Sequence, residues 1–220
     1  VTNLVNAYYA SKLFPQYVCK GKLKKEQNED VKKKVAGLMI SKVGVVSRNG
    51  LDSIFLSAFF GLTTVAMYGN YYYIMGAVQG FLGVLIISIQ AGIGNSIASE
   101  SVEKNYHDIK KFLFMYMWLA GWCCVCLVCL YQPFMHIWVG EELTFPFSVM
   151  ILFCMYFYTL CQGDICGAYS NAIGYWWQVK QKYIAETVLN LVLNITLVIL
   201  WGIHGIIIAT MLSILIVSYS

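Results

Sequence analysis

The stretch "GLMISKVGVVSRNGLDSIFLSAFFG", residues 37–61, is long and apolar enough to cross a lipid bilayer. It nevertheless carries Lys42, Arg48 and Asp52 in its interior. A charged side chain at the centre of a bilayer costs about 2.5 kcal/mol or more, so membrane helices keep such groups where they face protein or water. The stretch therefore predicts a transmembrane helix that turns one polar face into a bundle.

The polar residues of this stretch share one face of the predicted helix. At about 100° per residue, a sector of about 140° contains Ser41, Lys42, Arg48, Asn49 and Asp52. This stripe predicts a face turned toward a water-filled cavity or the bundle interior. Arg48 and Asp52 are also four positions apart and can pair with each other. An alternative interpretation is that this pair only fastens helices together, while Lys42 extends to the lipid headgroups.

The composition extends this interpretation to the whole chain of 220 residues, of which 59% are hydrophobic and only 12% charged. Soluble domains usually carry about 25% charged residues. A transmembrane helix needs about 20 mostly apolar residues. Six such stretches occur, at about 35–61, 65–98, 112–131, 147–169, 183–201 and 205–220. We therefore predict an all-α fold, a polytopic membrane bundle of about six transmembrane helices.

The basic residues are distributed unevenly between the loops. Spans that alternate in direction bring 13 of the 15 Lys and Arg residues to one side of the membrane. These are Lys12, Lys20, Lys22, Lys24, Lys25, Lys32, Lys33, Lys34, Lys104, Lys110, Lys111, Lys180 and Lys182. The other two, Lys42 and Arg48, lie in the first span. By the positive-inside rule, the basic loops of this multi-pass protein are cytoplasmic.

The polar segment before the first span predicts how the chain is organised. Residues 1–18 look like the end of a preceding transmembrane helix, and residues 19–34 form a basic cytoplasmic linker to the bundle of residues 35–220. Because the chain starts at Val1 within apolar sequence, we expect a piece of a longer protein whose N-terminal bundle is missing. Alternatively, the linker's charge only anchors the helix end beside anionic membrane lipids.

Further polar residues lie in the other spans. Asp164 lies well inside the fourth span, where a carboxylate is either functional or tied to a neighbour by a hydrogen bond. Glu186 lies about one turn inside the fifth span, which favours an interfacial position. Asn70 and Tyr72 in the second span offer an amide and an aromatic hydroxyl suited to sugar rings, although tyrosines there also serve packing.

No pattern in the sequence indicates an enzyme. His107, His136 and His204 fall in or near three separate loops. Most of the cysteines lie in apolar runs, where thiols act as small apolar side chains. A Gly-rich phosphate loop for ATP is also missing from the sequence. We therefore predict no enzyme activity, metal site, cofactor or nucleic-acid partner. Instead, we predict transport that is driven by an ion gradient or by the substrate's own gradient.

Three longer segments carry a family resemblance. They are "GLMISKVGVVSRNGLDSIFLSAFFGLTTVAMYGNYYYI" (37–74), "SIQAGIGNSIASES" (88–101) and "YQPFMHIWVGEE" (131–142). Together they resemble bacterial polysaccharide flippases of the Wzx type, which belong to the MOP exporter superfamily with the multidrug MATE transporters. The resemblance implies two six-helix bundles that face each other across a central cavity, of which this chain is the C-terminal half.

The resemblance also implies a substrate. This is an oligosaccharide linked to undecaprenyl diphosphate, flipped from the cytoplasmic to the outer leaflet of the bacterial plasma membrane for polysaccharide biosynthesis. The expected substrate-binding residues are Lys42, Arg48, Asn49, Asp52, Asn70 and Tyr72. Asp52 and Asp164 are expected to hold the cations apart or to couple transport to an ion. The alternatives are a MATE-type multidrug exporter, which favours acidic and aromatic cavity groups, and a non-transporting membrane scaffold.

Overall fold

The computed structural model describes residues 2–17 and 24–218, in two units, Val1–Lys33 and Lys34–Ser220. In the first unit, the exposed helix α1 (Thr2–Leu13) leads into a single 3-10 turn, η1 (Pro15–Tyr17). Helix α2 (Lys25–Phe60) also begins in this unit. The part of the predicted linker from Lys25 onward is therefore helical, whereas residues 18–23, with Lys20 and Lys22, lie outside the described residues.

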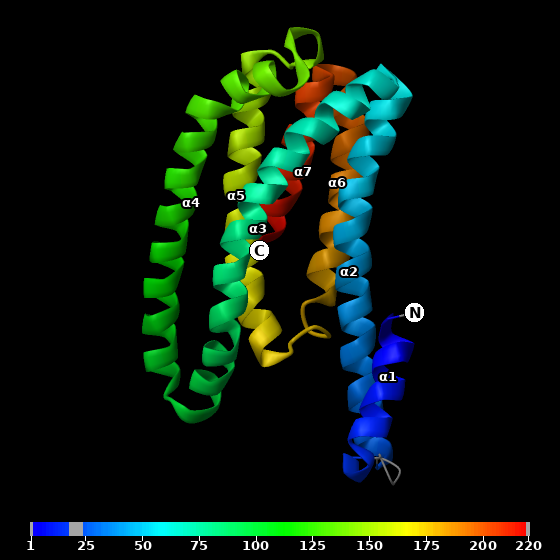
Figure 1. Ribbon diagram of the computed structural model, residues 1–220, viewed down its shortest axis with the longest axis vertical. Helices are drawn as coiled ribbons and strands as arrows, with labels where there is room; N and C mark the ends of the chain where they lie inside the picture. The colour runs from blue at the N-terminus through cyan, green and yellow to red at the C-terminus, as the bar shows by residue number, and fades with distance from the viewer. Residues whose placement is uncertain (1, 18–23, 219–220) are drawn as a thin grey trace. The chain divides into compact units, whose positions relative to one another are not determined.

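The second unit is a bundle of helices that run up and down in turn (Figure 1). The rest of α2 is followed by α3 (Leu62–Ser99), α4 (Val102–Val139), α5 (Phe147–Ile173), α6 (Lys180–Trp201) and α7 (Ile203–Ser218). The described residues contain no β-strand, which confirms the predicted all-α fold. Among them, four helices, α3 to α6, are long and apolar enough to cross a membrane, and α7 is a shorter apolar helix.

Several helices extend beyond the apolar stretches that predict them. Helix α4, for example, starts ten residues before the predicted span 112–131. The reason is that hydropathy marks only the lipid-buried part of a helix, whereas caps and backbone hydrogen bonds set its ends. Here Ser101 caps α4, because its hydroxyl accepts a hydrogen bond from the backbone N–H of Lys104 at 3.3 Å. Hydropathy therefore locates α4 correctly and underestimates its length.

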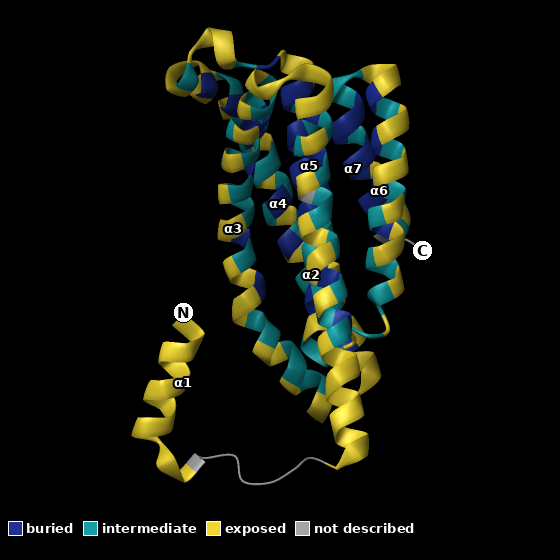
Figure 2. Ribbon diagram, turned by 90° about the vertical axis from the view of Figure 1, so that its right-hand side faces the viewer, coloured by how far each residue is buried: buried dark blue, intermediate teal, exposed yellow. Residues whose placement is uncertain are grey.

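Helix α5 supplies the centre of the core. It packs against α3, α4 and α7, and α6 packs against α7. Val149, Phe153 and Tyr156 of α5 are fully buried. Figure 2 shows buried residues gathered between these helices and exposed residues on the outer faces. Large apolar side chains such as Trp118 and Ile199 are each 69% exposed there, as expected for faces in contact with lipid.

Helix α2 approaches the α5–α6 connection closely at Gly37. A Cβ atom built on Gly37 would lie 2.6 Å from the backbone of Trp176, so only glycine fits. Two turns further on, a Cβ on Gly44 would lie 3.2 Å from the hydroxyl of Thr187 on α6. These two glycines bring the backbone of α2 against α6 and its preceding loop. The polar residues that follow on the same face of α2 are thereby directed at α6 and α7.

Candidate functional site

The polar stripe of α2 faces the bundle, with Lys42 at its margin. Ser41 is 7% exposed and Asp52 is 1% exposed, and the Arg48 side chain is 12% exposed. Lys42 is exposed, while the side chain of Asn49 lies outside the part of the structure that is described. The buried sector of α2 is therefore centred on Ser41, Arg48 and Asp52.

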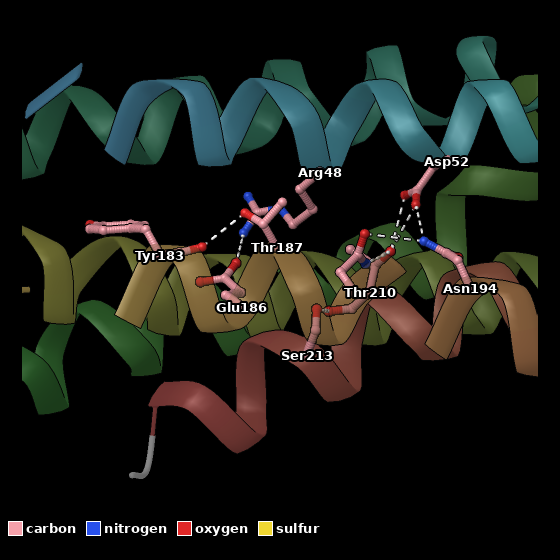
Figure 3. Close-up of polar contacts among 9 residues, drawn as sticks. Arg48, Asp52, Tyr183, Glu186, Thr187, Asn194, Thr210 and Ser213 are labelled. Atoms are coloured by element: carbon pink, nitrogen blue, oxygen red, sulfur yellow. Dashed lines mark hydrogen bonds and ion pairs between the residues drawn. The ribbon is translucent and has the colours of Figure 1, made fainter. Parts of the chain in front are cut away.

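Arg48 forms an ion pair with Glu186 of α6 (Figure 3). Its Nη1 atom donates a hydrogen bond to Oε1 of Glu186 at 2.5 Å, and the Glu186 side chain is only 11% exposed. The predicted pairing of Arg48 with Asp52 is wrong, and so is the predicted interfacial position of Glu186. The position of Glu186 near the end of its span suggested contact with the lipid headgroups. Its side chain instead points across the bundle, where the buried cation Arg48 compensates its charge.

A polar cavity of about 400 Å³ opens beside this ion pair. Its polar lining residues are Ser41, Lys42 and Arg48 of α2, Tyr72 and Gln79 of α3, Asp164, Ser170 and Asn171 of α5, and Lys182, Tyr183 and Glu186 of α6. Three of these side chains are basic and two are acidic. Gln79 donates a hydrogen bond of 2.7 Å to Asp164, which fixes one of the two carboxylates. The cavity therefore offers positive charge, neutral donors and aromatic rings together.

Asp52 lies one turn beyond Arg48 in a separate, buried network (Figure 3). Its carboxylate accepts hydrogen bonds from the hydroxyls of Tyr68 (3.1 Å) and Thr210 (3.0 and 3.1 Å) and from the amide of Asn194 (3.2 Å). Asn190 donates in turn to Thr210 at 3.0 Å. All of these donors are neutral. A buried carboxylate surrounded by neutral groups is a place where a proton or a small cation is stabilised.

The structure separates the sequence-predicted residues into three groups. The first group lines the polar cavity beside the ion pair and consists of Lys42, Arg48, Tyr72 and Asp164. Asp52 belongs to the buried network that it forms with Tyr68, Asn194 and Thr210. Asn70 is half-buried on α3 and is not among the cavity-lining residues.

Sequence reasoning missed the polar stripe of α6. Glu186, Asn190 and Asn194 recur every four residues, so they share one helical face, and all three are buried. That periodicity was visible in the sequence and could have revealed the face that meets α2. Thr210 on α7 gave no such signal, because a hydroxyl inside an apolar helix commonly bonds to its own backbone.

Apolar helices around a charged cavity define a polytopic membrane protein with an internal polar site. Two solved structures share this fold. One is an outward-facing multidrug resistance MATE family transporter of the MOP superfamily, with a TM-score of 0.72 and 16% identity over 86% of this chain and 43% of that one. The other is a MOP superfamily transporter from Pyrococcus furiosus, with a TM-score of 0.65 and 16% identity over 86% of this chain and 42% of that one.

These likenesses show the fold of the chain. The chain shares the fold of these two transporters, and it spans less than half the length of either one. The Pyrococcus furiosus protein is described as having a binding pocket of reverse polarity that suggests a different function. No protein-family model matches the sequence, and no curated protein matches it.

Proposed function

We propose that the full-length protein is a membrane transporter that flips an oligosaccharide linked to undecaprenyl diphosphate from the cytoplasmic to the outer leaflet of the bacterial plasma membrane. Such a flippase serves polysaccharide biosynthesis. The observation that carries the proposal is the placement of Lys42, Arg48 and Lys182 in the wall of one cavity among apolar helices. We expect the part of the full-length protein outside this chain, which spans less than half the length of either structural neighbour, to supply the other wall of the transport path.

The cavity suits an anionic headgroup that carries sugars. Arg48 presents a planar set of N–H donors, which matches phosphate oxygens better than a lysine does. Lys42 adds a second cation that stabilises a diphosphate, and Lys182 adds positive charge to the same cavity wall. Tyr72 and Tyr183 add ring faces and hydroxyls for sugar residues. A role for Asn49 or Asn70 in substrate binding stays a prediction.

The Asp52 network suits ion coupling. A proton or a small cation on Asp52 compensates a carboxylate that is 1% exposed and bonded only to neutral donors. The side-chain oxygen of Asn194 is buried there without a hydrogen-bond partner among the described residues, so it offers one further ligand atom. Asp164, in the cavity wall, is a second coupling candidate. Occupancy of Asp52 would change how α2 binds α6 and α7, and thereby couple an ion gradient to transport.

The main alternative is a MATE-type exporter of cationic drugs. It is favoured by Asp164 and Glu186 in the cavity and by the multidrug resistance transporter among the structural neighbours. The pocket of the Pyrococcus furiosus neighbour, described as reversed in polarity, suggests that this fold accommodates pockets of either sign. A non-transporting scaffold is the remaining alternative, in which the polar stripe of α2 only joins helices.

The test is replacement of Arg48 in the full-length protein. Arg48→Ala is expected to abolish surface polysaccharide while membrane insertion persists. Because that variant leaves Glu186 buried without its cation, the double variant Arg48→Gln with Glu186→Gln is made alongside it. Lys104→Gln, at an exposed residue outside the cavity, is the control. Normal polysaccharide in both Arg48 variants would support the scaffold, and loss of drug resistance alone would support the exporter.

A further inference from the structure

The ion pair between Arg48 and Glu186 satisfies only part of the guanidinium. The contact joins a single nitrogen, Nη1, to a single oxygen of Glu186. The Nε atom of Arg48 is buried and has no hydrogen-bond partner among the described residues. A buried donor without a partner destabilises the folded state, because its hydrogen bond to water is lost and not replaced. Arg48 therefore retains a binding capacity that Glu186, in this geometry, does not use.

Glu186 has a second potential cation on its own helix. Lys182 precedes it by four residues on α6 and lines the same cavity. Side chains four positions apart on a helix lie close enough to form an ion pair. A small rotation of the Glu186 side chain would therefore exchange Arg48 for Lys182 without leaving the carboxylate unpaired.

From these observations we propose that Glu186 determines specificity by competing with the ligand for Arg48. A phosphate-bearing headgroup takes Arg48 through its two terminal nitrogens, Nη1 and Nη2, and Glu186, displaced from Nη1, passes to Lys182. A tethered carboxylate is present at high effective concentration, so only a ligand more strongly anionic than a carboxylate displaces it. This inference rests on the proposed function, because it assumes an anionic ligand in the cavity, and it adds that diphosphate is preferred over monophosphate.

The exchange also accounts for the charges of the cavity. Arg48, Lys42 and Lys182 face the carboxylates Glu186 and Asp164, and Gln79 holds Asp164 by a hydrogen bond. When Glu186 moves to Lys182, Arg48 and Lys42 are both left for the ligand. Two cations match the two phosphates of a diphosphate, whereas a single phosphate uses only one of them.

The test measures binding of polyprenyl diphosphate and polyprenyl monophosphate to the purified full-length transporter in detergent. In Glu186→Gln, monophosphate binding should tighten roughly tenfold, and the preference for diphosphate should shrink, because the internal competitor has lost its charge. Lys182→Gln should weaken diphosphate binding several-fold, since Glu186 then has no second cation. Glu142→Gln makes the same chemical change at an exposed residue and should alter neither affinity. Thermal unfolding of each variant checks that the fold is retained.

The outcomes separate this inference from the proposed function. If the wild type binds diphosphate through Arg48 and Glu186→Gln changes neither affinity, the competition is refuted and the proposed function stands. If the wild type binds neither lipid, both are refuted. If Glu186→Gln weakens binding of the cation tetraphenylphosphonium and Arg48→Gln tightens it, the cavity is a cation site and both are again refuted.

Discussion

Arg48 and Asp52 lie one turn apart on α2, yet they bind different side chains. Arg48 forms its ion pair with Glu186 of α6. Asp52 instead accepts a hydrogen bond from the hydroxyl of Thr210 on α7, shared between its two oxygens, and others from Asn194 of α6 and Tyr68 of α3. The distance between the two residues along the helix suits a mutual pair. Because their partners differ, the protein has two neighbouring polar sites along α2, one in a cavity and one in a buried network. The first suits a ligand, and the second suits an ion.

Removal of the charge on Asp52 is expected to uncouple transport from its driving ion. Asp52→Asn should retain ligand binding within about twofold, because Asp52 does not line the cavity. Transport in proteoliposomes should no longer accelerate when a proton or sodium gradient is imposed. Asp108→Asn, at an exposed residue outside the site, is the matched control. A variant that still responds fully to both gradients would exclude Asp52 as the coupling residue.

The hydrogen bonds of Thr210 should contribute to stability through Asp52. Thr210→Val keeps the shape of a fully buried side chain but removes its donor, so we expect a loss of about 1–3 kcal/mol in the free energy of unfolding. The effect should be smaller when Asp52 is already Asn, because the two residues form one network. Denaturation of the purified protein, analysed as a double-mutant cycle, measures this. Strictly additive losses would show that the two residues act independently.

The close approach at Gly37 gives a prediction with a control on the same helix. Gly37→Ala should destabilise the fold by about 1–3 kcal/mol, because the new methyl group would overlap the backbone of Trp176. Gly50→Ala places a methyl group where no atom lies within 4 Å and should be neutral or stabilising by up to about 1 kcal/mol. Thermal unfolding distinguishes the two. Equal effects would mean that α2 does not depend on contact at Gly37.

The orientation of the helices can be tested by labelling. The positive-inside rule places the α3–α4 turn in the cytoplasm and the α4–α5 connection outside. A cysteine in place of Lys104 should therefore react with an impermeant maleimide only in opened cells, and one in place of Glu142 should react in intact cells. Both are compared with the parent protein, which contributes the background from its own exposed Cys129 and Cys166. The reverse pattern would place the basic loops outside.

The sequence predicted the polar face of α2 but not the partners of its residues. Periodicity places Ser41, Arg48 and Asp52 in one sector because a helix repeats every 3.6 residues. It gives no information on the rotation of the neighbouring helix, which decides whether Arg48 meets Asp52 or Glu186. The position of Glu186 was predicted wrongly for the same reason. The sequence indicates how far the residue lies from the end of the span, but not the direction in which its side chain points.

The ends of the helices also differ between the sequence-based prediction and the structure. Apolar stretches in the sequence located each helix of the bundle, because a helix in contact with lipid needs apolar side chains along its whole lipid-buried length. It could not show that α2 begins at Lys25 or that α4 extends to Val139, since polar turns continue a helix beyond the lipid at little cost. The cavity was also beyond prediction in detail. It depends on Gln79, Asp164 and Lys182, which come from three different helices.

The most direct test of an anionic ligand at Arg48 is a flipping assay in proteoliposomes. The purified full-length protein is reconstituted with a fluorescent oligosaccharide linked to undecaprenyl diphosphate, and movement between leaflets is followed by quenching from outside. The wild type should move the lipid, and the charge-neutral pair Arg48→Gln with Glu186→Gln should move it at least about tenfold more slowly, the equivalent of about 1.4 kcal/mol in activation free energy. Equal rates for the two proteins would contradict the account.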